Sequence, residues 1–332
     1  NQFGQMSTNL LLVSPYSLNY FGGVQNQLLL IKKFLPKDDY NLKFLCPDSP
    51  DFNLGKPIKM PFNGSVAPIA LFANKKTILK AISWADVVHL HEPFIPIFFW
   101  RFPIDKRTII SHHASLSILL SSIQKKLIKK ERHAHAVTAV SKEASKHVVS
   151  SVDVQIVPNA IELTNNSQNF SGGSDILFIG RNEKRKNYEL YEQLSLVTKN
   201  RNYNFRAITN QNIHSENISV FVNPDNGIKE RLLKKSSIYL AVNTHGESFG
   251  ITIVEAINSG CIAICSDIQP FIELLEESGV YFKNNDLESL TLAVEDIISN
   301  DVTNIYLKQL KHIRKYDIDK VITSWISLYS QI

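Results

Sequence analysis

The sequence predicts an α/β protein with two doubly wound, Rossmann-like domains, each built on a parallel sheet. Short apolar runs with strand character, such as residues 10–13, alternate with amphipathic runs of helical periodicity, such as residues 24–34. Continuous apolar strands between helices are typical of parallel sheets that helices cover on both faces. A length of 332 residues suggests about two domains. The alternation restarts at residue 176, after a polar stretch at 159–168.

The expected elements follow this alternation in order. In the first half we predict helices at 24–34 and 75–84 and strands at 10–13, 42–45, 86–90, 107–111, 136–140 and 154–157. In the second half we predict a helix at 188–198 and strands at 176–180, 205–208, 219–222, 238–242 and 262–265. Doubly wound sheets bind ligands beyond the carboxyl ends of their strands. Side chains that follow these strands are therefore the candidates for a functional site.

The composition is that of an ordinary globular protein, with 44% hydrophobic and 20% charged residues. The net charge of +5 favours an anionic partner only weakly, and no nucleic-acid recognition motif accompanies the basic residues. Cys46, Cys261 and Cys265 fit no metal spacing. Without a recognisable signal peptide, they favour a reducing cytosol, where we expect them to be buried. No apolar run is long enough to span a membrane.

The most informative motif is a pair of carboxylates, Glu247 and Glu255, eight positions apart. Between them, Ser248, Phe249, Gly250 and Ile251 read as the start of a helix, and we expect Ser248 to be its N-cap. The first N–H groups of such a helix form a cradle for a diphosphate. Glu255, about 9–10 Å along the helix, is placed to accept hydrogen bonds from a ribose diol. The alternative is a capped amphipathic helix with two surface glutamates.

Glycines and cations at other strand ends support a phosphorylated ligand. Gly180 ends a predicted strand, and Arg181 and Lys186 follow it, five residues apart. An Arg fork and a Lys point charge can share one diphosphate, although a solvated basic loop also explains residues 182–185. Gly22 and Gly23 follow the first strand, where glycine permits positive φ and close approach of a ligand. A plain turn explains this pair equally well.

Histidines end two predicted strands of the first half. His89 and His91 alternate along one strand, and we expect them to point to opposite faces and not to share a metal. His91 with Glu92 is interpreted as a ligand-facing strand end, and His113 follows the next strand. The sequence 317–319 spells Asp-x-Asp, but it opens the terminal helix and is interpreted as a cap. We therefore predict no metal site.

Taken in order, these motifs resemble the family 4 retaining glycosyltransferases of GT-B fold, over nearly the whole chain. The glycine pair, the strand-end histidines, the Gly-Arg…Lys motif and the Glu-x7-Glu motif carry the resemblance. Within the family, the segments 21–25, 61–67, 89–93 and 246–251 are most similar to the phosphatidylinositol mannosyltransferases. The resemblance implies two Rossmann-like domains facing across a cleft, with the last helix crossing back. An acceptor-binding domain would span 6–160 and 316–332, and a nucleotide-sugar-binding domain 161–315.

The family implies roles for particular residues. Glu247 would contact the transferred hexose and Glu255 the ribose, while Arg181 and Lys186 would hold the diphosphate. His113 would lie near the anomeric centre. The remaining donor contacts would come from Gly22, Gly23, Gly180, Ser248, Phe249, Gly250 and Ile251. Polar side chains of the first domain would meet the acceptor: Tyr16, Gln25, Asn63, Ser65, His91 and Glu92.

The resemblance favours GDP-mannose as donor and a phosphatidylinositol-like lipid as acceptor, with no metal held by the protein and Mg²⁺ at most accompanying the diphosphate. The resemblance implies retention without a demonstrated protein nucleophile, with the leaving diphosphate thought to deprotonate the acceptor on the same face. The family often carries a Lys shortly after the active-site His, whereas residues 114–118 contain none. Another nucleotide-sugar with a soluble or polysaccharide acceptor, and a non-catalytic binding module, remain as alternatives.

Basic residues accompany apolar ones in two segments of the first half. Residues 116–132 and 75–84 contain this pattern, with Lys75, Lys76, Lys80, Lys125, Lys126, Lys129 and Lys130. An amphipathic helix with a basic face suits an anionic lipid surface, although a core-packed helix with a solvated face has the same pattern. The family resemblance favours a cytoplasmic enzyme, peripheral on the inner face of the plasma membrane.

Overall fold

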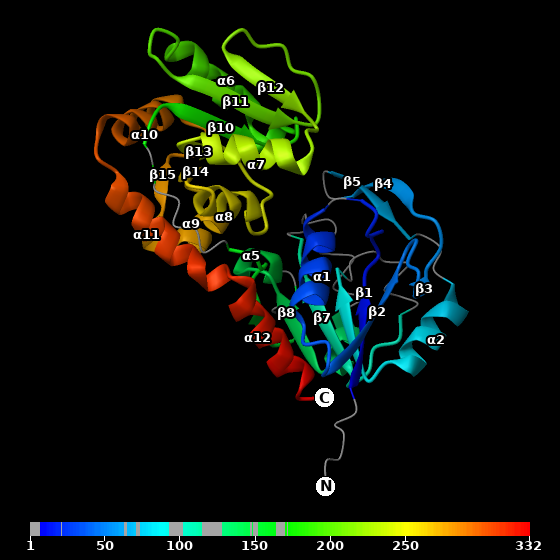
Figure 1. Ribbon diagram of the computed structural model, residues 1–332. Coiled ribbons are helices and arrows are strands. Elements are labelled where there is room, and N and C mark those ends of the chain that lie inside the picture. Colours follow the sequence, from blue (N-terminus) through cyan, green and yellow to red (C-terminus); the bar gives the residue numbers. More distant parts are fainter. Residues whose placement is uncertain are drawn as a thin grey trace. The chain divides into compact units, whose positions relative to one another are not determined.

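The computed structural model describes residues 7–20, 22–62, 65–70, 74–92, 102–114, 128–146, 148, 152–163, 170 and 172–332. Side chains at 60–62, 65–67, 128 and 129 are outside this description. The chain forms two compact units, drawn in Figure 1. The first comprises Asn1–Glu162 with Ile318–Ile332, and the second comprises Leu163–Asp317.

The first unit is built on a parallel sheet of seven strands in the order β3-β2-β1-β6-β7-β8-β9. The strands are β1 (Thr8–Val13), β2 (Tyr40–Cys46), β3 (Phe52–Asn53), β6 (Val87–His91), β7 (Thr108–His112), β8 (Ala136–Ala139) and β9 (Val154–Ile156). A separate antiparallel hairpin joins β4 (Ile58–Phe62) and β5 (Ser65–Ile69). The strand order reverses between β1 and β6, as in a doubly wound sheet.

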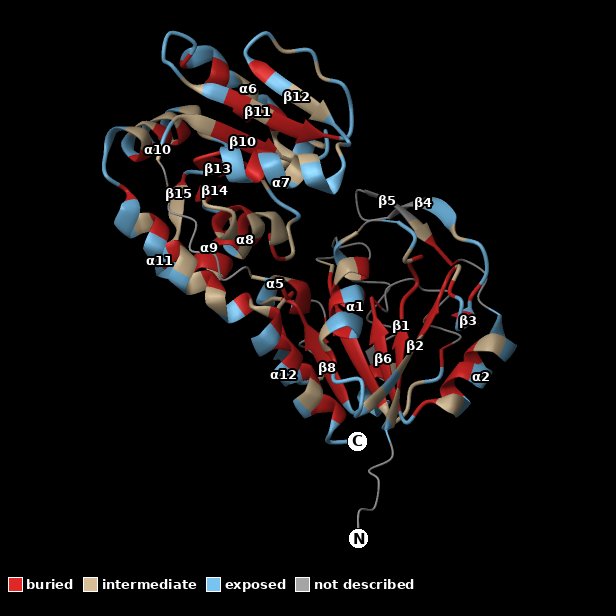
Figure 2. Cartoon of the chain, in the orientation of Figure 1, coloured by how far each residue is buried: buried red, intermediate tan, exposed pale blue. Residues whose placement is uncertain are grey.

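Helices cover both faces of this sheet because its strands are apolar on both sides. Along β1, Leu11 and Val13 pack in the core that includes α2 (Lys75–Trp84), whereas Leu10 and Leu12 pack with α1 (Gly23–Phe34) and α12 (Ile318–Tyr329). The central strands β6, β7 and β8 are buried along their whole length, as Figure 2 shows for β6 and β8. The short elements α5 (Lys142–Ser145) and η1 (Ile128–His133) flank β8 in sequence.

The second unit has a parallel sheet of six strands in the order β12-β11-β10-β13-β14-β15. The strands are β10 (Asp175–Ile179), β11 (Asn204–Thr209), β12 (Ile218–Val222), β13 (Ile238–Ala241), β14 (Ile262–Ser266) and β15 (Val280–Phe282). The helices are α6 (Tyr188–Val197), α7 (Asn226–Lys235), α8 (Ile251–Asn258), α9 (Gln269–Leu275), α10 (Leu287–Ser299) and α11 (Thr303–Ile313), with short turns η2 (Lys184–Lys186), η3 (Glu276–Ser278) and η4 (Arg314–Tyr316). Here the order reverses between β10 and β13.

The predicted fold class is confirmed: both sheets are parallel, doubly wound and covered by helices. Every predicted strand overlaps an observed strand, and the helix predicted at 75–84 has those bounds. The prediction missed β3, β15 and the β4–β5 hairpin. The three cysteines are free and buried, as expected. Of the amphipathic segment predicted at 116–132, residues 116–127 lie outside the described residues, and 128–132 belong to the 3₁₀ turn η1.

Candidate active site

In the second unit, the predicted donor motifs meet where the strand order reverses. Ligands of doubly wound domains bind in the crevice at this point. The segment after β10 carries Gly180, Arg181 and Lys186, and the segment after its neighbour β13 carries Glu247. The structure therefore brings these motifs together at the carboxyl edge of the sheet.

An ion pair between Lys186 and Glu247 forms the centre of this site. The Lys186 ammonium donates to Glu247 Oε2 at 2.7 Å, and the Asn243 amide donates to the same oxygen at 3.0 Å. The side chains of the pair are only 17% and 18% exposed. Burial alone raises the pKa of the Glu247 carboxyl, but the Lys186 and Arg185 cations outweigh it and hold the pKa below its ordinary value. Glu247 is therefore a fixed carboxylate that can accept hydrogen bonds from hydroxyl groups.

Residues 246–250 are tied to the neighbouring basic turn η2. Arg185 Nη1 donates to the Gly246 carbonyl at 2.9 Å, and the Thr244 N–H donates to the Arg185 carbonyl at 2.9 Å. Phe249 is buried and packs edge-on against Tyr316, with ring centroids 5.2 Å apart. The backbone around Glu247 is thus anchored from two sides.

The prediction that Ser248 caps the next helix is wrong. α8 begins at Ile251, and Gly250 occupies the N-cap position with a φ of 97°. This left-handed conformation favours glycine, and a Cβ there would lie 3.1 Å from Ile253 Cδ1. The glycine, not the serine, therefore sets where the helix begins. The N–H groups of the first residues of α8 remain without i−4 carbonyl partners, as in any helix.

Glu255 forms the second ion pair of the site. It lies on α8, and Lys229 Nζ on α7 donates to its Oε2 at 2.7 Å. Asp225 caps α7 by accepting from the Ile228 N–H at 2.8 Å. Each carboxylate of the Glu-x7-Glu motif is therefore paired with a lysine from a different element.

The basic loop after β10 is only partly solvated. Arg181 is open, with a side chain 48% exposed and 3.8 Å from Glu183 Oε1. Lys184 is exposed too, but Arg185 and Lys186 turn back onto residues 246 and 247. Gly180 is required because a Cβ there would lie 2.7 Å from the Phe178 ring. The loop is therefore organised around the site, with Arg181 left to meet a ligand.

In the first unit, the strand order reverses next to the glycine pair. Gly22 follows β1 with an extended φ of −171°, and Gly23 opens α1, so positive φ is not the reason for glycine at position 22. A Cβ on Gly22 would lie 2.2 Å from Gln25 Oε1, which favours glycine beside this side chain. Gln25 is buried and donates from Nε2 to the Ser17 carbonyl.

Glu92, directly after β6, is in an unusual state. Its φ is 53°, an uncommon value for a residue with a side chain, and it is 1% exposed. Burial raises the pKa of the carboxyl to about 8, although the backbone N–H groups of Ala114 and His113 oppose the rise. The pKa of Tyr16 is raised by burial and also by the nearby Glu92 carboxylate. Two of the predicted acceptor-binding residues, Tyr16 and Glu92, therefore interact.

Replacing Glu92 by glutamine is expected to flatten the pH dependence of stability. Between the ordinary pKa of 4.5 and the folded value of about 8, the folded protein keeps a proton that the unfolded chain has lost. The stability from this proton is fully present below 4.5 and is lost as the pH rises to about 8, with a slope of about 1.4 kcal/mol per pH unit. In urea titrations at pH 5 to 8, the free energy of unfolding of Glu92→Gln should increase relative to that of the wild type as the pH rises. If the difference in free energy of unfolding between Glu92→Gln and the wild type stays constant with pH, the pKa of Glu92 is not raised in the folded protein.

His89, His91 and His113 lie on one face of the sheet, so the prediction of opposite faces for the first two is wrong. Side chains alternate along a strand with a period of two, and residues two apart therefore point the same way. The ring centroids of His89 and His91 are 3.9 Å apart, and His91 Nδ1 lies 3.0 Å from His113 Nε2. Among the described residues, no group of three or more His, Cys, Asp or Glu side chains could hold a metal ion.

Several predicted residues cannot be placed or lie apart. Asn63, Lys125 and Lys126 are outside the described residues, as are the side chains of Ser65 and Lys129. His91 has no exposed surface. The three lysines of α2 are exposed, as the membrane hypothesis requires: Lys75, Lys76 and Lys80. Within the described part of the chain, no helix is long and apolar enough to cross a membrane.

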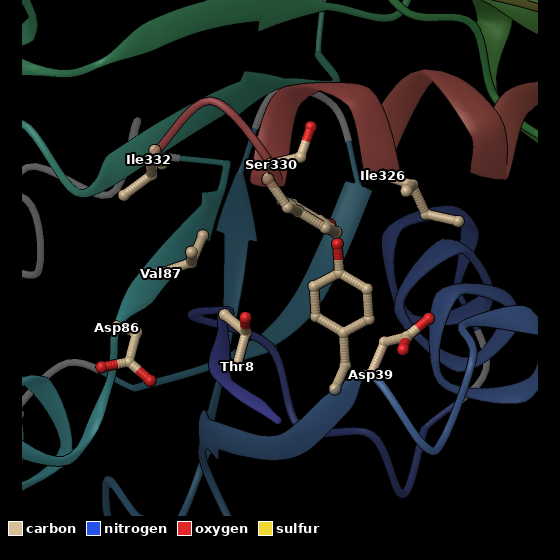
Figure 3. A pocket seen from close by; sticks show the side chains of 9 residues that line it. Thr8, Asp39, Asp86, Val87, Ile326, Ser330 and Ile332 are labelled. Carbon is tan, nitrogen blue, oxygen red and sulfur yellow. The ribbon is translucent and has the colours of Figure 1, made fainter. Parts of the chain in front are cut away.

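A cavity of about 580 Å³ lies at the opposite, amino-terminal edge of the first sheet. Figure 3 shows Thr8, Asp39 and Asp86 beside the start of the strands and Ile326 on α12. Ligands of doubly wound sheets bind at the other edge, so this cavity is separate from the candidate site.

Three residues that shape the second-unit site were not predicted from the sequence. Asn243 follows β13 and bonds Glu247, and Arg185 holds residue 246. Lys229 pairs with Glu255. Only Lys229 had a usable signal, because Asp225 is a recognisable helix cap that fixes which face of α7 the lysine occupies.

Comparison with known proteins places this site in a family. Two family models match consecutive parts of the chain: Glycosyltransferase Family 4 over residues 21–165 and Glycosyl transferases group 1 over residues 160–318. A phosphatidyl-myo-inositol mannosyltransferase from Mycobacterium leprae is 26% identical, over 97% of this chain and 96% of its own length. A GDP-mannose:cellobiosyl-diphosphopolyprenol alpha-mannosyltransferase from Xanthomonas oryzae pv. oryzae is 24% identical over 76% of each chain.

Solved structures agree with the fold. A glycosyltransferase from Rickettsia africae superposes with a TM-score of 0.69 over 98% of each chain, at 16% identity. The Glu-x7-Glu motif and the basic residues after β10 fall within the second matched region. The chain therefore belongs to the family 4 glycosyltransferases and has the GT-B fold.

Proposed function

We propose that this glycosyltransferase moves mannose from GDP-mannose to a phosphatidylinositol-like lipid, with retention of configuration. The observation that carries the proposal is the pair of lysine-bound carboxylates, Glu247 and Glu255, on either side of the start of α8. The mannosyltransferase from Mycobacterium leprae, similar along nearly its whole length, supports the lipid acceptor. The relative from Xanthomonas, whose name includes GDP-mannose, supports the donor.

We assign the donor to the second unit. Glu247 accepts hydrogen bonds from the hexose, and Glu255 accepts from the ribose diol. An ammonium has three donors, and Lys186 uses one on Glu247, so two remain for phosphate oxygens. Arg181, an exposed cation of the same loop, adds a forked contact to the diphosphate. The N–H groups of Phe249, Gly250 and Ile251 complete the phosphate cradle.

The chemistry follows from where charge develops. The bond from the anomeric carbon to the diphosphate oxygen breaks, and negative charge grows on the leaving phosphate. Lys186 and Arg181 stabilise this charge, which is the part of catalysis that preorganised cations supply. The acceptor oxygen attacks the same face, and its proton passes to the departing phosphate oxygen. We assign the stabilisation of positive character at the anomeric carbon to His113.

We assign the acceptor to the first unit. Tyr16, Gln25, Asn63 and Ser65 provide the polar groups for an inositol ring. Glu92 is only 1% exposed, and burial raises the pKa of its carboxyl, so it supports this group from the interior, next to Tyr16. The exposed lysines of α2 supply attraction to anionic lipid, about 1 kcal/mol for each basic residue near the surface.

The protein should float with phosphatidylinositol vesicles at low salt. The charge-reversed variant Lys75→Glu/Lys76→Glu/Lys80→Glu should not float under the same conditions. Equal flotation of the two proteins would argue against binding to the lipid surface.

A donor screen tests the proposal. Ligand that binds the native state raises its apparent stability, by about 2.7 kcal/mol at a concentration of 100 times Kd. GDP and GDP-mannose should therefore raise the melting temperature more than UDP- or ADP-sugars at equal concentration. If only UDP- or ADP-sugars raise it, the alternative of another donor with a soluble or polysaccharide acceptor holds. If no nucleotide-sugar binds, the chain is a non-catalytic binding module.

A further inference from the structure

Three histidines of the first unit stack into a column that ends at His113. The rings of His89 and His91 have centroids 3.9 Å apart at 34°, and those of His91 and His113 are 5.2 Å apart at 28°. Each ring is buried, with His113 the most exposed at 8%. On α12, the Trp325 ring lies 4.5 Å and the Tyr329 ring 5.7 Å from His89. The column therefore runs from α12 to the strand end where His113 lies.

The base of the column has a fixed direction of hydrogen bonding. Thr138 Oγ1 donates to the Ile110 carbonyl at 3.2 Å, so its lone pair accepts from Ser111 Oγ at 2.7 Å. Because a hydroxyl has one proton, Ser111 must in turn accept from His89 Nε2 at 2.7 Å. Neutral His89 then presents a bare Nδ1, which accepts from the Tyr329 hydroxyl at 2.8 Å. One backbone carbonyl thus sets the tautomer of His89.

At the top of the column, a separate hydrogen bond joins His91 to His113. Burial lowers the pKa of all three histidines, for His113 to about 4, so each ring carries a single proton. His91 Nε2 has no hydrogen-bond partner among the described residues. A buried N–H without an acceptor is rarer than a buried lone pair without a donor, which places the His91 proton on Nδ1. His91 then donates to His113 Nε2 at 3.0 Å, and His113 carries its own proton on Nδ1.

We propose that His91 is a positioning residue that fixes the ring and the Nδ1–H tautomer of His113, supported from α12 through His89. This role rests on the proposed function, in which His113 stabilises the positive character of the anomeric carbon. It replaces the acceptor contact expected for His91, because no surface of His91 is exposed. A neutral ring held in one orientation and one tautomer is preorganised and loses no rotational freedom at each turnover.

The main test compares two replacements of His91. His91→Asn keeps an N–H close to the position of Nδ1, whereas His91→Phe keeps the stacked ring but removes the donor. We expect His91→Phe to lower kcat about 100-fold with the donor KM within about twofold, and His91→Asn to retain most of kcat. The same replacements of exposed His214 are the controls and should change neither constant. Equal losses of kcat in His91→Asn and His91→Phe would overturn the proposal.

A second measurement does not depend on turnover. Nitrogen-15 spectra of ring-labelled histidine should show His113 as the Nδ1–H tautomer in the wild type, and a mixture of tautomers in His91→Phe. Tyr329→Phe keeps the ring on α12 but removes the hydroxyl from His89, so the His89 signals should shift. Tyr40→Phe is its control, because Tyr40 lines the same cavity and packs edge-on against Tyr329, with centroids 5.9 Å apart.

The two readouts separate this proposal from the proposed function. The proposed role of His91 is wrong if wild-type His113 is protonated on Nε2, or if the His113 tautomer is unchanged in His91→Phe. Either result would decide this even if the enzyme transfers mannose. Should no nucleotide-sugar be turned over, the proposed function fails, but the spectra still decide whether the column orders His113. If His91→Phe does not fold, the spectra of Tyr329→Phe provide the test. Unchanged signals from all three histidines would contradict coupling between α12 and the histidine column.

Discussion

Replacing Glu247 by glutamine is expected to lower kcat/KM for sugar transfer by about 10²–10³-fold. Glutamine keeps the size of the side chain and a carbonyl oxygen for the Asn243 amide. It removes the charge that orders Lys186, and it replaces one acceptor oxygen of the hexose site by a donor. The loss should fall mainly on kcat, because the contacts to phosphate and ribose remain.

The matched control for this variant is Glu295→Gln. Glu295 also forms an ion pair with a cation at 2.7 Å, but with Arg201 on the surface, where that side chain is 50% exposed. Surface pairs of this kind contribute about 0–1 kcal/mol, so both stability and transfer should stay close to wild type. If Glu247→Gln transfers sugar as fast as Glu295→Gln, the assignment of Glu247 to the hexose is wrong.

Replacing Lys186 by methionine should affect both activity and stability. The side chain keeps most of its length, but the leaving diphosphate loses a cation, and we expect kcat to fall by about 10²-fold or more. Glu247 is also left largely buried without its main cation, which should lower the free energy of unfolding by about 1–3 kcal/mol. Steady-state kinetics and urea unfolding measure the two effects separately.

A double-mutant cycle tests whether the two residues act as a pair. Adding Glu247→Gln to Lys186→Met removes the unpaired carboxylate, so part of the lost stability should return, whereas activity should not. Coupling between contacting residues is typically about 0.5–3 kcal/mol. Strictly additive losses of stability would show that the 2.7 Å contact contributes nothing in solution.

The order of strands and helices was predictable because both sheets are parallel and buried. Runs such as 10–13 and 262–265 are apolar on both faces, and helices with one apolar face separate them. Two of the strands that were not predicted are very short. β3 has two residues and β15 has three, which is too little for a periodicity.

The site was predictable at the level of motifs but not of contacts. The Glu-x7-Glu motif and the cations after β10 are close together, because they follow β13 and β10, the two neighbouring strands between which the strand order reverses. The partner of each carboxylate was not predictable. The cap Asp225 indicates which face of α7 Lys229 occupies, but the contact of Lys229 with Glu255 depends on tertiary packing. The start of α8 was misjudged because a left-handed glycine, Gly250, overrides the preference of serine for an N-cap.

The prediction that His89 and His91 point to opposite faces of the sheet was wrong for a different reason. The period of two along a strand already places His89 and His91 on one side, so the correct arrangement was within reach of the sequence. Their stacking on His113 was not, because it depends on the register of β6 with β7, in which His91 pairs with Ser111. Register in a parallel sheet is set by contacts distant in sequence.

The central claim is transfer of mannose that depends on the Glu247 site. It is tested most directly by following labelled mannose from GDP-mannose into phosphatidylinositol vesicles, with wild-type protein, Glu247→Gln and Glu295→Gln side by side. We predict that label enters the lipid with the wild type and Glu295→Gln, and that the rate with Glu247→Gln is lower by about 10²-fold or more. The account is contradicted if no label enters the lipid while a UDP- or ADP-sugar is transferred, or if Glu247→Gln labels the lipid as fast as the wild type.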